Sequence, residues 1–280
     1  MAIPILKTWQ NYFTDEPNEG LGSSYERIIL NIKLDEIIQK YNCKSLLEVP
    51  IFGFTGVSGI NSMHVAKSGL PVTLIDNDQS RLEMIKNVWE KSNLSANFRF
   101  QKDFKKIELP NESIDMSWNF SALWFVENLT VFLHELTRVT KNVIMLCVPN
   151  RSGIGYLSQK YISGTDLRKY LIEDNIIPKN IIAEMRKLNW KLVERNYIDC
   201  PPWPDIGMDK RDFLKIFHLD FLLKSKTEKI DEKICILKYY QDKDLDFAEQ
   251  MMNYYWLEKI APKFFKAFWA HHKFLIFERN

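Results

Sequence analysis

The fold of this chain is constrained most by a pattern between residues 25 and 150, where short apolar runs alternate with longer amphipathic stretches. The runs have the length of β-strands, and the stretches between them place apolar residues at helical spacing. Repeated strand and helix units of this kind build a parallel sheet with helices on its faces. We therefore predict an α/β fold of the doubly wound type.

The same pattern predicts where the elements lie. We expect helices at 25–41, 79–91 and 126–139, and strands at 45–49, 72–75, 97–101, 113–118 and 143–148. Further on, we expect a helix at 178–188, a strand at 190–198 and a last strand at 273–278. These positions divide the chain into an N-terminal segment (1–24), a core (25–199 with 270–280) and a mainly helical insertion (200–269) that we expect to shape part of the site.

Composition argues against several classes of protein. A chain of 280 residues with 46% hydrophobic and 26% charged residues can bury a full core. Its 38 lysines and arginines nearly balance its 36 aspartates and glutamates, so the chain has no strong positive electrostatic field that would favour binding of nucleic acid. The four cysteines form no CxxC pair, and no apolar run is long enough to cross a bilayer. Because the N-terminus also lacks a signal-peptide core, we expect a cytoplasmic protein.

Acidic residues and glycines gather where the predicted strands end. Glu48 ends the first strand and is followed by a turn with Gly53 and Gly56, while Asp76 closes the second strand. Glycines let the backbone approach a ligand closely. An acid at the end of the second strand can accept hydrogen bonds from both hydroxyl groups of a ribose. Alternatively, the glycine turn only connects a strand to a helix, and Asp76 only caps the helix that follows it.

A third acid favours the ligand-binding interpretation. Asp103 follows the third strand, where its carboxylate can accept from an adenine amino group while Phe104 packs nearby. Three strand ends then direct acids toward one crevice at the carboxyl edge of a parallel sheet. This layout suits a cofactor that contains a nucleoside.

With these residues in order, and with the block Ser113 to Asn119 and the strand ending Val148-Pro149-Asn150 after them, the chain resembles the class I S-adenosylmethionine-dependent methyltransferases. The resemblance covers residues 25–150 and, more weakly, the last strand. It implies a Rossmann-like sheet of seven strands whose last strand is antiparallel. It also implies S-adenosyl-L-methionine as cofactor, with these binding residues: Glu48, Pro50, Gly53, Thr55, Gly56, Asp76, Asn77, Asp103, Phe104, Asn119, Phe120, Tyr25 and Arg27.

Two positions depart from the family pattern. Pro50 stands where the first glycine of the loop is usual, so we expect a longer and stiffer turn after Glu48. Glu127-Asn128 stands where many relatives carry a Glu-His pair, so the sequence assigns no catalytic base. Methyl transfer by in-line displacement then depends chiefly on positioning.

The acceptor is predicted only by class. Asn119-Phe120-Ser121-Ala122 lacks the Pro-Pro run of enzymes that methylate nucleic-acid bases, so we expect a small or medium-sized acceptor with an oxygen, nitrogen or carbon nucleophile. Ser121, Trp124 and Trp203 are candidates for its pocket, although most tryptophans belong to cores.

The two ends of the chain are interpreted less directly. Residues 1–24 precede the first helix and are a candidate lid over the cofactor, with Tyr25 and Arg27 near its carboxylate end, against the alternative of a solvated helix start. His271 and His272 are expected at the surface or in packing, because no further ligand spacing supports a metal pair, and we predict no metal.

Two other functions stay open at this point. The glycine turn and Asp76 also suit the ribose of NAD, which would make the protein an NAD-dependent oxidoreductase. The missing Glu-His pair also allows a non-catalytic, methyltransferase-like binding protein that presents the insertion as a binding surface. The oligomeric state is not set by the sequence.

Overall fold

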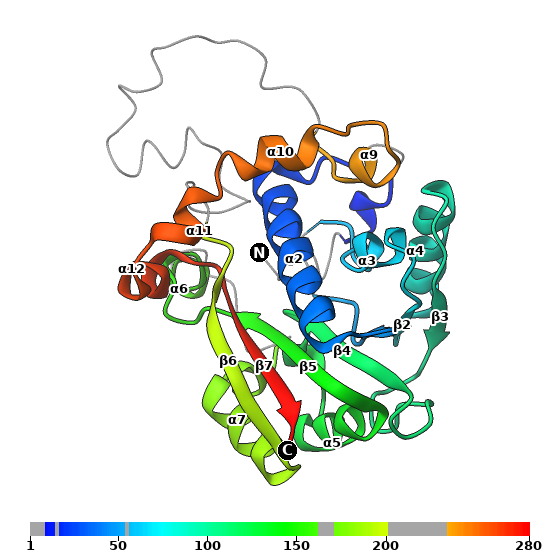
Figure 1. Ribbon diagram of the computed structural model, residues 1–280, viewed down its shortest axis with the longest axis vertical. Coiled ribbons are helices and arrows are strands. Elements are labelled where there is room, and N and C mark those ends of the chain that lie inside the picture. Colours follow the sequence, from blue (N-terminus) through cyan, green and yellow to red (C-terminus); the bar gives the residue numbers. More distant parts are fainter. Residues whose placement is uncertain (1–8, 15–16, 54–55, 162–170, 201–233) are drawn as a thin grey trace.

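The structure is a computed structural model that describes residues 9–14, 17–53, 56–161, 171–200 and 234–280. Its centre is one seven-stranded sheet in the order β3-β2-β1-β4-β5-β7-β6 (Figure 1). The strands are β1 (Leu46–Glu48), β2 (Val72–Asp76), β3 (Asn97–Phe100), β4 (Ile114–Phe120), β5 (Thr140–Pro149), β6 (Trp190–Ile198) and β7 (His272–Arg279). The first five run parallel, and β7 lies antiparallel between β5 and β6. The predicted α/β sheet with an antiparallel last strand is confirmed.

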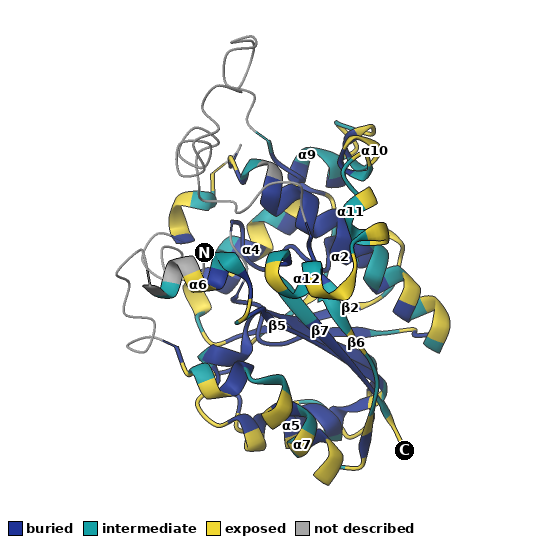
Figure 2. Ribbon diagram, turned by 90° about the vertical axis from the view of Figure 1, so that its left-hand side faces the viewer, coloured by how far each residue is buried: buried dark blue, intermediate teal, exposed yellow. Residues whose placement is uncertain are grey.

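Helices cover both faces of this sheet. On one face lie α2 (Gly20–Tyr41), α3 (Met63–Lys67) and α4 (Gln79–Lys91), and on the other lie α5 (Leu129–Val139) and α7 (Pro178–Lys187) (Figure 1). The strands serve both cores by alternation: Met145 packs with the first set of helices, while Ile144 and Leu146 pack with the second. Buried residues therefore run through the centre of the sheet in Figure 2.

Local sequence accounts for several helix ends. Asp78 caps α4 by accepting a hydrogen bond from the backbone of Arg81 (3.0 Å), and Asn128 caps α5 by accepting from Val131 (3.1 Å). Pro178 opens α7 as expected of a first helical residue. Helix α2 differs, because it begins at Gly20 rather than at Tyr25. The Gly- and Ser-containing stretch is typical of a loop, but here it is buried, and packing outweighs its weak helix propensity.

The described part of the region before β7, residues 234–271, is mainly helical, while residues 201–233 of the predicted insertion lie outside the described residues. It contains α9 (Leu237–Tyr240), α10 (Phe247–Met252), α11 (Trp256–Ile260) and α12 (Lys263–Trp269). The first two lie over α2 and α3, where Lys67 Nζ donates to the carbonyl of Tyr240 (3.0 Å) (Figure 1). The remaining elements of the described residues are α6 (Ile154–Tyr161) and the 3-10 helices η1 (Trp9–Tyr12), η2 (Leu123–Phe125) and η4 (Glu173–Ile176). Among the described helices, none combines the length and apolarity needed to cross a bilayer.

Candidate functional site

The carboxyl edge of the sheet brings the predicted site residues together. Glu48 ends β1, Asp76 ends β2 and Phe120 ends β4, and these strands are parallel neighbours or next neighbours. Parallel strands present their carboxyl ends at one edge, where open α/β sheets bind ligands. The antiparallel β7 begins at the same edge, because His272 pairs with Pro149.

Glu48 is buried within a polar network. Its carboxylate accepts from Ser62 Oγ (2.5 Å) and from Asn61 Nδ2 (3.3 Å), and Trp118 Nε1 donates to the same serine hydroxyl (3.1 Å). Burial raises the pKa of Glu48 to about 7, although its two side-chain hydrogen bonds oppose that rise. The carboxylate thereby links the end of β1 to the start of α3.

The loop after Glu48 lies directly against the end of β4. A Cβ atom on Gly53 would stand 2.6 Å from the backbone carbonyl oxygens of Phe120 and Ser121, so no side chain fits there. Gly56 has a φ of 102°, and a Cβ atom on it would stand 2.5 Å from Glu19 Oε1. Pro50 is buried and follows a cis peptide bond. Thr55 lies outside the described residues.

Asp76 is already paired. Arg81 Nε donates to one carboxylate oxygen of Asp76 (2.8 Å), Arg81 Nη2 donates to the other, and the latter also accepts from the backbone of Asp78 (2.9 Å). The guanidinium carbon of Arg81 lies 3.9 Å from the ring centre of Phe52 and 5.4 Å from that of Trp9. A ribose would therefore have to share Asp76 with Arg81.

A small open pocket continues from Asp76 along the edge. It brings Asn77, Asp103 and Phe104, all predicted from sequence, beside Phe125 and Val126. One oxygen of Asp103 accepts from the backbone of Lys105 (2.9 Å), while Phe104 is anchored edge-on against Phe132 (6.2 Å between ring centres). An aromatic wall with an adjacent amide and carboxylate can hold a flat, hydrogen-bonding ring.

The end of β4 offers a buried acceptor. Asn119 is fully buried, and its Nδ2 donates to the carbonyl of Val49 (3.2 Å), whereas its Oδ1 has no hydrogen-bond partner among the described residues. Ser121, which follows β4, has a φ of 53°, a strained value for a residue other than glycine. Trp124 packs within the core beside α5, and Trp203 lies outside the described residues.

Tyr25 and Arg27 lie in different surroundings, although both are fully buried on α2. Arg27 reaches the glycine loop, where its Nη2 donates to the carbonyl of Val57 (2.7 Å) and pairs with Glu19 (2.7 Å). Glu19 also accepts from the backbone amide of Val57 (2.8 Å). Burial raises the pKa of the Tyr25 hydroxyl, and the neighbouring Glu258 and Asp199 raise it further.

Sequence reasoning missed Glu19, Arg81 and the Asn61-Ser62 pair. The sequence places Arg81 in the first turn of the helix that follows Asp76. It does not indicate that the Arg81 guanidinium bonds the Asp76 carboxylate at the end of β2. Glu19 lies in the N-terminal segment (1–24), which the sequence predicts only as a candidate lid.

Comparison with known proteins agrees with this geometry. A family model for a methyltransferase domain matches residues 55–146, from the glycine loop through most of β5. No curated protein sequence matches the chain.

Solved structures share the fold at low sequence identity. An S-adenosylmethionine-dependent methyltransferase from Thermotoga maritima, titled a possible histamine N-methyltransferase, is 10% identical with a TM-score of 0.50, covering 99% of this chain and 97% of its own. An S-adenosylmethionine-dependent methyltransferase from Archaeoglobus fulgidus is 11% identical with a TM-score of 0.50, covering 90% and 94%. The [4+2]-cyclase SpnF is 14% identical with a TM-score of 0.50, covering 89% and 80%.

The methyltransferase family match, together with the seven-stranded sheet and antiparallel last strand that the resemblance implied, argues against the oxidoreductase alternative. Residues 55–146 are therefore a methyltransferase domain, and S-adenosylmethionine is the cofactor of this enzyme.

Proposed function

We propose that this methyltransferase modifies a small or medium-sized acceptor with an oxygen, nitrogen or carbon nucleophile, bound at the end of β4. The observation that carries the proposal is the unpaired, buried Oδ1 of Asn119, which lies where the glycine loop meets that strand. A buried hydrogen-bond acceptor without a donor is costly in free energy. The ammonium group in the methionine part of S-adenosylmethionine would donate to Asn119 Oδ1. The cofactor, when bound, supplies an electrophilic methyl group on its sulfonium.

The adenosine end of the cofactor is assigned to the pocket beyond β2. Asn77 and Asp103 would hydrogen-bond the adenine, and Phe104 would contribute to the apolar wall. Each carboxylate oxygen can accept two hydrogen bonds, and Arg81 uses one on each oxygen of Asp76. The remaining acceptor positions of Asp76 would take hydrogen bonds from the ribose hydroxyls.

The amino-acid end is assigned to the glycine loop and the β4 terminus. Glu48 and Pro50 fix the loop, Gly53 lets it approach the strand, and Asn119 with Phe120 borders the methionine part. Thr55 and Gly56 stay predicted contacts. Arg27 would meet the cofactor carboxylate, whereas Tyr25, buried toward Glu258 and Asp199, would support α2 rather than touch the cofactor.

The N-terminal segment is proposed as a lid over this crevice. Trp9 packs edge-on against Phe52 of the first loop (6.4 Å between ring centres) and covers Arg81. Glu19 pairs with Arg27 and with the amide of Val57, the groups proposed for the cofactor carboxylate. A segment that covers both ends of the crevice would exclude water once the cofactor is bound.

The acceptor would lie over Phe120 and Ser121, and catalysis would depend on positioning. Glu127, at the position of the usual Glu-His pair, is largely exposed and pairs with Lys105 (3.6 Å), so we assign it no catalytic role. Trp124 would support the pocket from the core, and Trp203 stays a predicted contact. The cytoplasmic location and the exclusion of nucleic acid also stay predictions.

Calorimetry with S-adenosylmethionine and S-adenosylhomocysteine tests the cofactor site. Gly53→Ala should abolish binding, because the new Cβ atom would collide with the carbonyls of Phe120 and Ser121. Asp103→Asn should weaken it by about tenfold, the effect of losing one charge-assisted hydrogen bond. Gly69→Ala is the matched control, because its added Cβ atom would meet no atom within 4 Å and its positive φ (87°) costs stability rather than binding.

The result that would contradict the assignment is no binding by the folded wild-type protein at high micromolar ligand. Unchanged affinity in the folded Gly53→Ala protein would move the cofactor away from the β4 terminus. Once binding is established, acceptor libraries of small amines, hydroxy compounds and carbon acids, read out by S-adenosylhomocysteine release, would test the acceptor class.

A further inference from the structure

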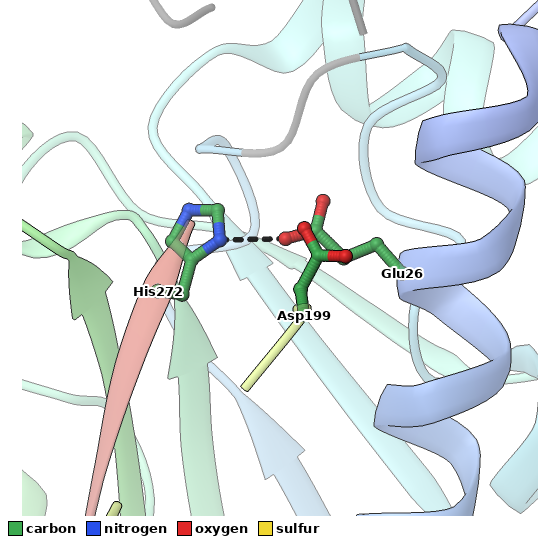
Figure 3. A group of neighbouring side chains, drawn as sticks. All are labelled: Glu26, Asp199 and His272. Carbon is green, nitrogen blue, oxygen red and sulfur yellow. Dashed lines mark ion pairs between the residues drawn. The ribbon is translucent and has the colours of Figure 1, made fainter. Parts of the chain in front are cut away.

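A second group of ionisable side chains lies at the same edge of the sheet, beside the end of β4. Glu26 comes from α2, Asp199 follows β6 and His272 begins β7, and Figure 3 shows the three side chains pointing toward one another. The sequence predicts His271 and His272 at the surface or in packing, and in the structure both side chains are mostly buried. Their side chains are only 9% and 15% exposed, and both lie against carboxylates.

The three potential ligand atoms converge. One atom of each residue lies within 4.8 Å of the corresponding atom of the other two, and His272 Nδ1 is 2.6 Å from Glu26 Oε1. Glu26 Oε1 is paired with His272 in this way and has no further hydrogen-bond partner among the described residues. Asp199 Oδ1 likewise has no hydrogen-bond partner among the described residues. Two carboxylate oxygens and an imidazole nitrogen that converge in a buried place are arranged as the ligands around a cation are.

Burial makes this arrangement costly without a positive charge. Glu26 is 1% exposed and Asp199 is fully buried. Two carboxylates removed from water are stable when they are paired or coordinate a metal.

The surrounding structure holds the group in place. His271 Nδ1 lies 2.7 Å from the second oxygen of Asp199, and the backbone amide of His271 donates to the carbonyl of Asp199 (3.0 Å). The His272 ring packs against Phe120 at the end of β4 (4.4 Å between ring centres). A side chain that orients a metal-binding carboxylate through its outer oxygen is a common support for metal sites.

We propose that Glu26, Asp199 and His272 bind a divalent transition-metal ion through Oε1, Oδ1 and Nδ1. Two carboxylate oxygens and one imidazole nitrogen suit zinc, manganese or iron(II) better than calcium or magnesium, which favour oxygen ligands. Three protein ligands leave coordination positions for water or for another molecule. The proposal concerns metal binding alone and holds whatever acceptor the enzyme uses.

The test measures metal binding by the full-length protein. After purification without chelators, elemental analysis should find about one equivalent of a transition metal per chain. After chelation, calorimetry should show Zn²⁺ or Mn²⁺ returning to one site. Glu26→Gln, Asp199→Asn and His272→Gln should each weaken that binding by more than about 100-fold, and His271→Gln, which alters only the support of Asp199, by about 10- to 100-fold.

A second His-Asp pair provides the matched control. His64 Nε2 on α3 lies 2.8 Å from Asp35 Oδ2 on α2, and this partly exposed pair is not part of the convergent group. His64→Gln and Asp35→Asn should leave the metal affinity unchanged. If they weaken it as much as His272→Gln and Asp199→Asn do, the proposal is wrong.

If a variant fails to fold, an experiment on the wild-type protein alone still tests the metal site. Co²⁺ added to the chelated protein should give visible bands of a nitrogen and oxygen site without thiolate charge transfer, although Cys200 follows Asp199 in sequence. No stoichiometric binding of Zn²⁺, Mn²⁺ or Co²⁺ at high micromolar metal would overturn the proposal. Thiolate bands would also overturn it, because they would place the ion on another set of ligands.

Discussion

At the scale of the residue, Glu48 couples the site to pH. Its pKa is raised by burial to about 7 from 4.5, so between these values the folded protein keeps a proton that the unfolded chain has released. This contribution to stability is present below pH 4.5 and is lost as the pH rises through about 7. Urea unfolding from pH 4.5 to 8 should therefore show a decline, of which Glu48→Gln removes up to about 3 kcal/mol.

The control for Glu48 is a carboxyl group of the same type at the surface. Glu83→Gln, on the exposed side of α4, should leave the slope of stability against pH unchanged. Some decline should remain in Glu48→Gln, because burial also raises the pKa of Glu258 to about 7. A slope identical to wild type in Glu48→Gln would mean that the carboxyl group ionises in the folded protein as it does in water.

At the scale of the element, the start of α2 competes with the proposed cofactor carboxylate. Glu19 pairs with Arg27 and accepts from Val57, all in buried surroundings. Glu19→Gln removes the competing charge, so S-adenosylhomocysteine should bind about tenfold tighter by calorimetry. Methylthioadenosine, which has no carboxylate, should bind as it does to wild type.

Glu36→Gln is the control, because Glu36 lies on the exposed part of the same helix and pairs only with Lys33 among the described residues (3.1 Å). It should change neither affinity. Weaker binding of both ligands to Glu19→Gln would instead mean that Glu19 holds the loop in its binding conformation.

The sequence predicts the positions of several elements but not the contacts between them. Periodicity located β2, α4 and β6 closely, since their patterns arise from burial on one or both faces. It placed Glu48 and Asp76 correctly at strand ends, but it could not show that Ser62 and Arg81 already bond them. The group that we propose as metal ligands could not be predicted because Glu26 and His272 are far apart in sequence, and β7 brings them together only by returning beside β5.

At the scale of the whole molecule, the two faces of the sheet should unfold together. The core on the α2 side includes Leu34 and Met145, while the core on the α5 side includes Phe132 and Ile144, so neighbouring residues of β5 belong to different cores. Loss of one core would expose one face of the strands that support the other. Leu34→Ala should cost about 2 to 5 kcal/mol and Phe132→Ala about 3 to 5 kcal/mol, each moving a single denaturant transition.

Far-UV and near-UV circular dichroism should report the same midpoint in each variant, as expected of one cooperative unit. Leu245→Ala, at a side chain that is 69% exposed, is the control and should shift that midpoint little. Two separated transitions in Phe132→Ala, with only the second matching wild type, would contradict this expectation. They would show that the helices on the α2 side, which carry Arg27 and Glu26, keep their structure without the other face, so that the site could persist in a partly unfolded chain.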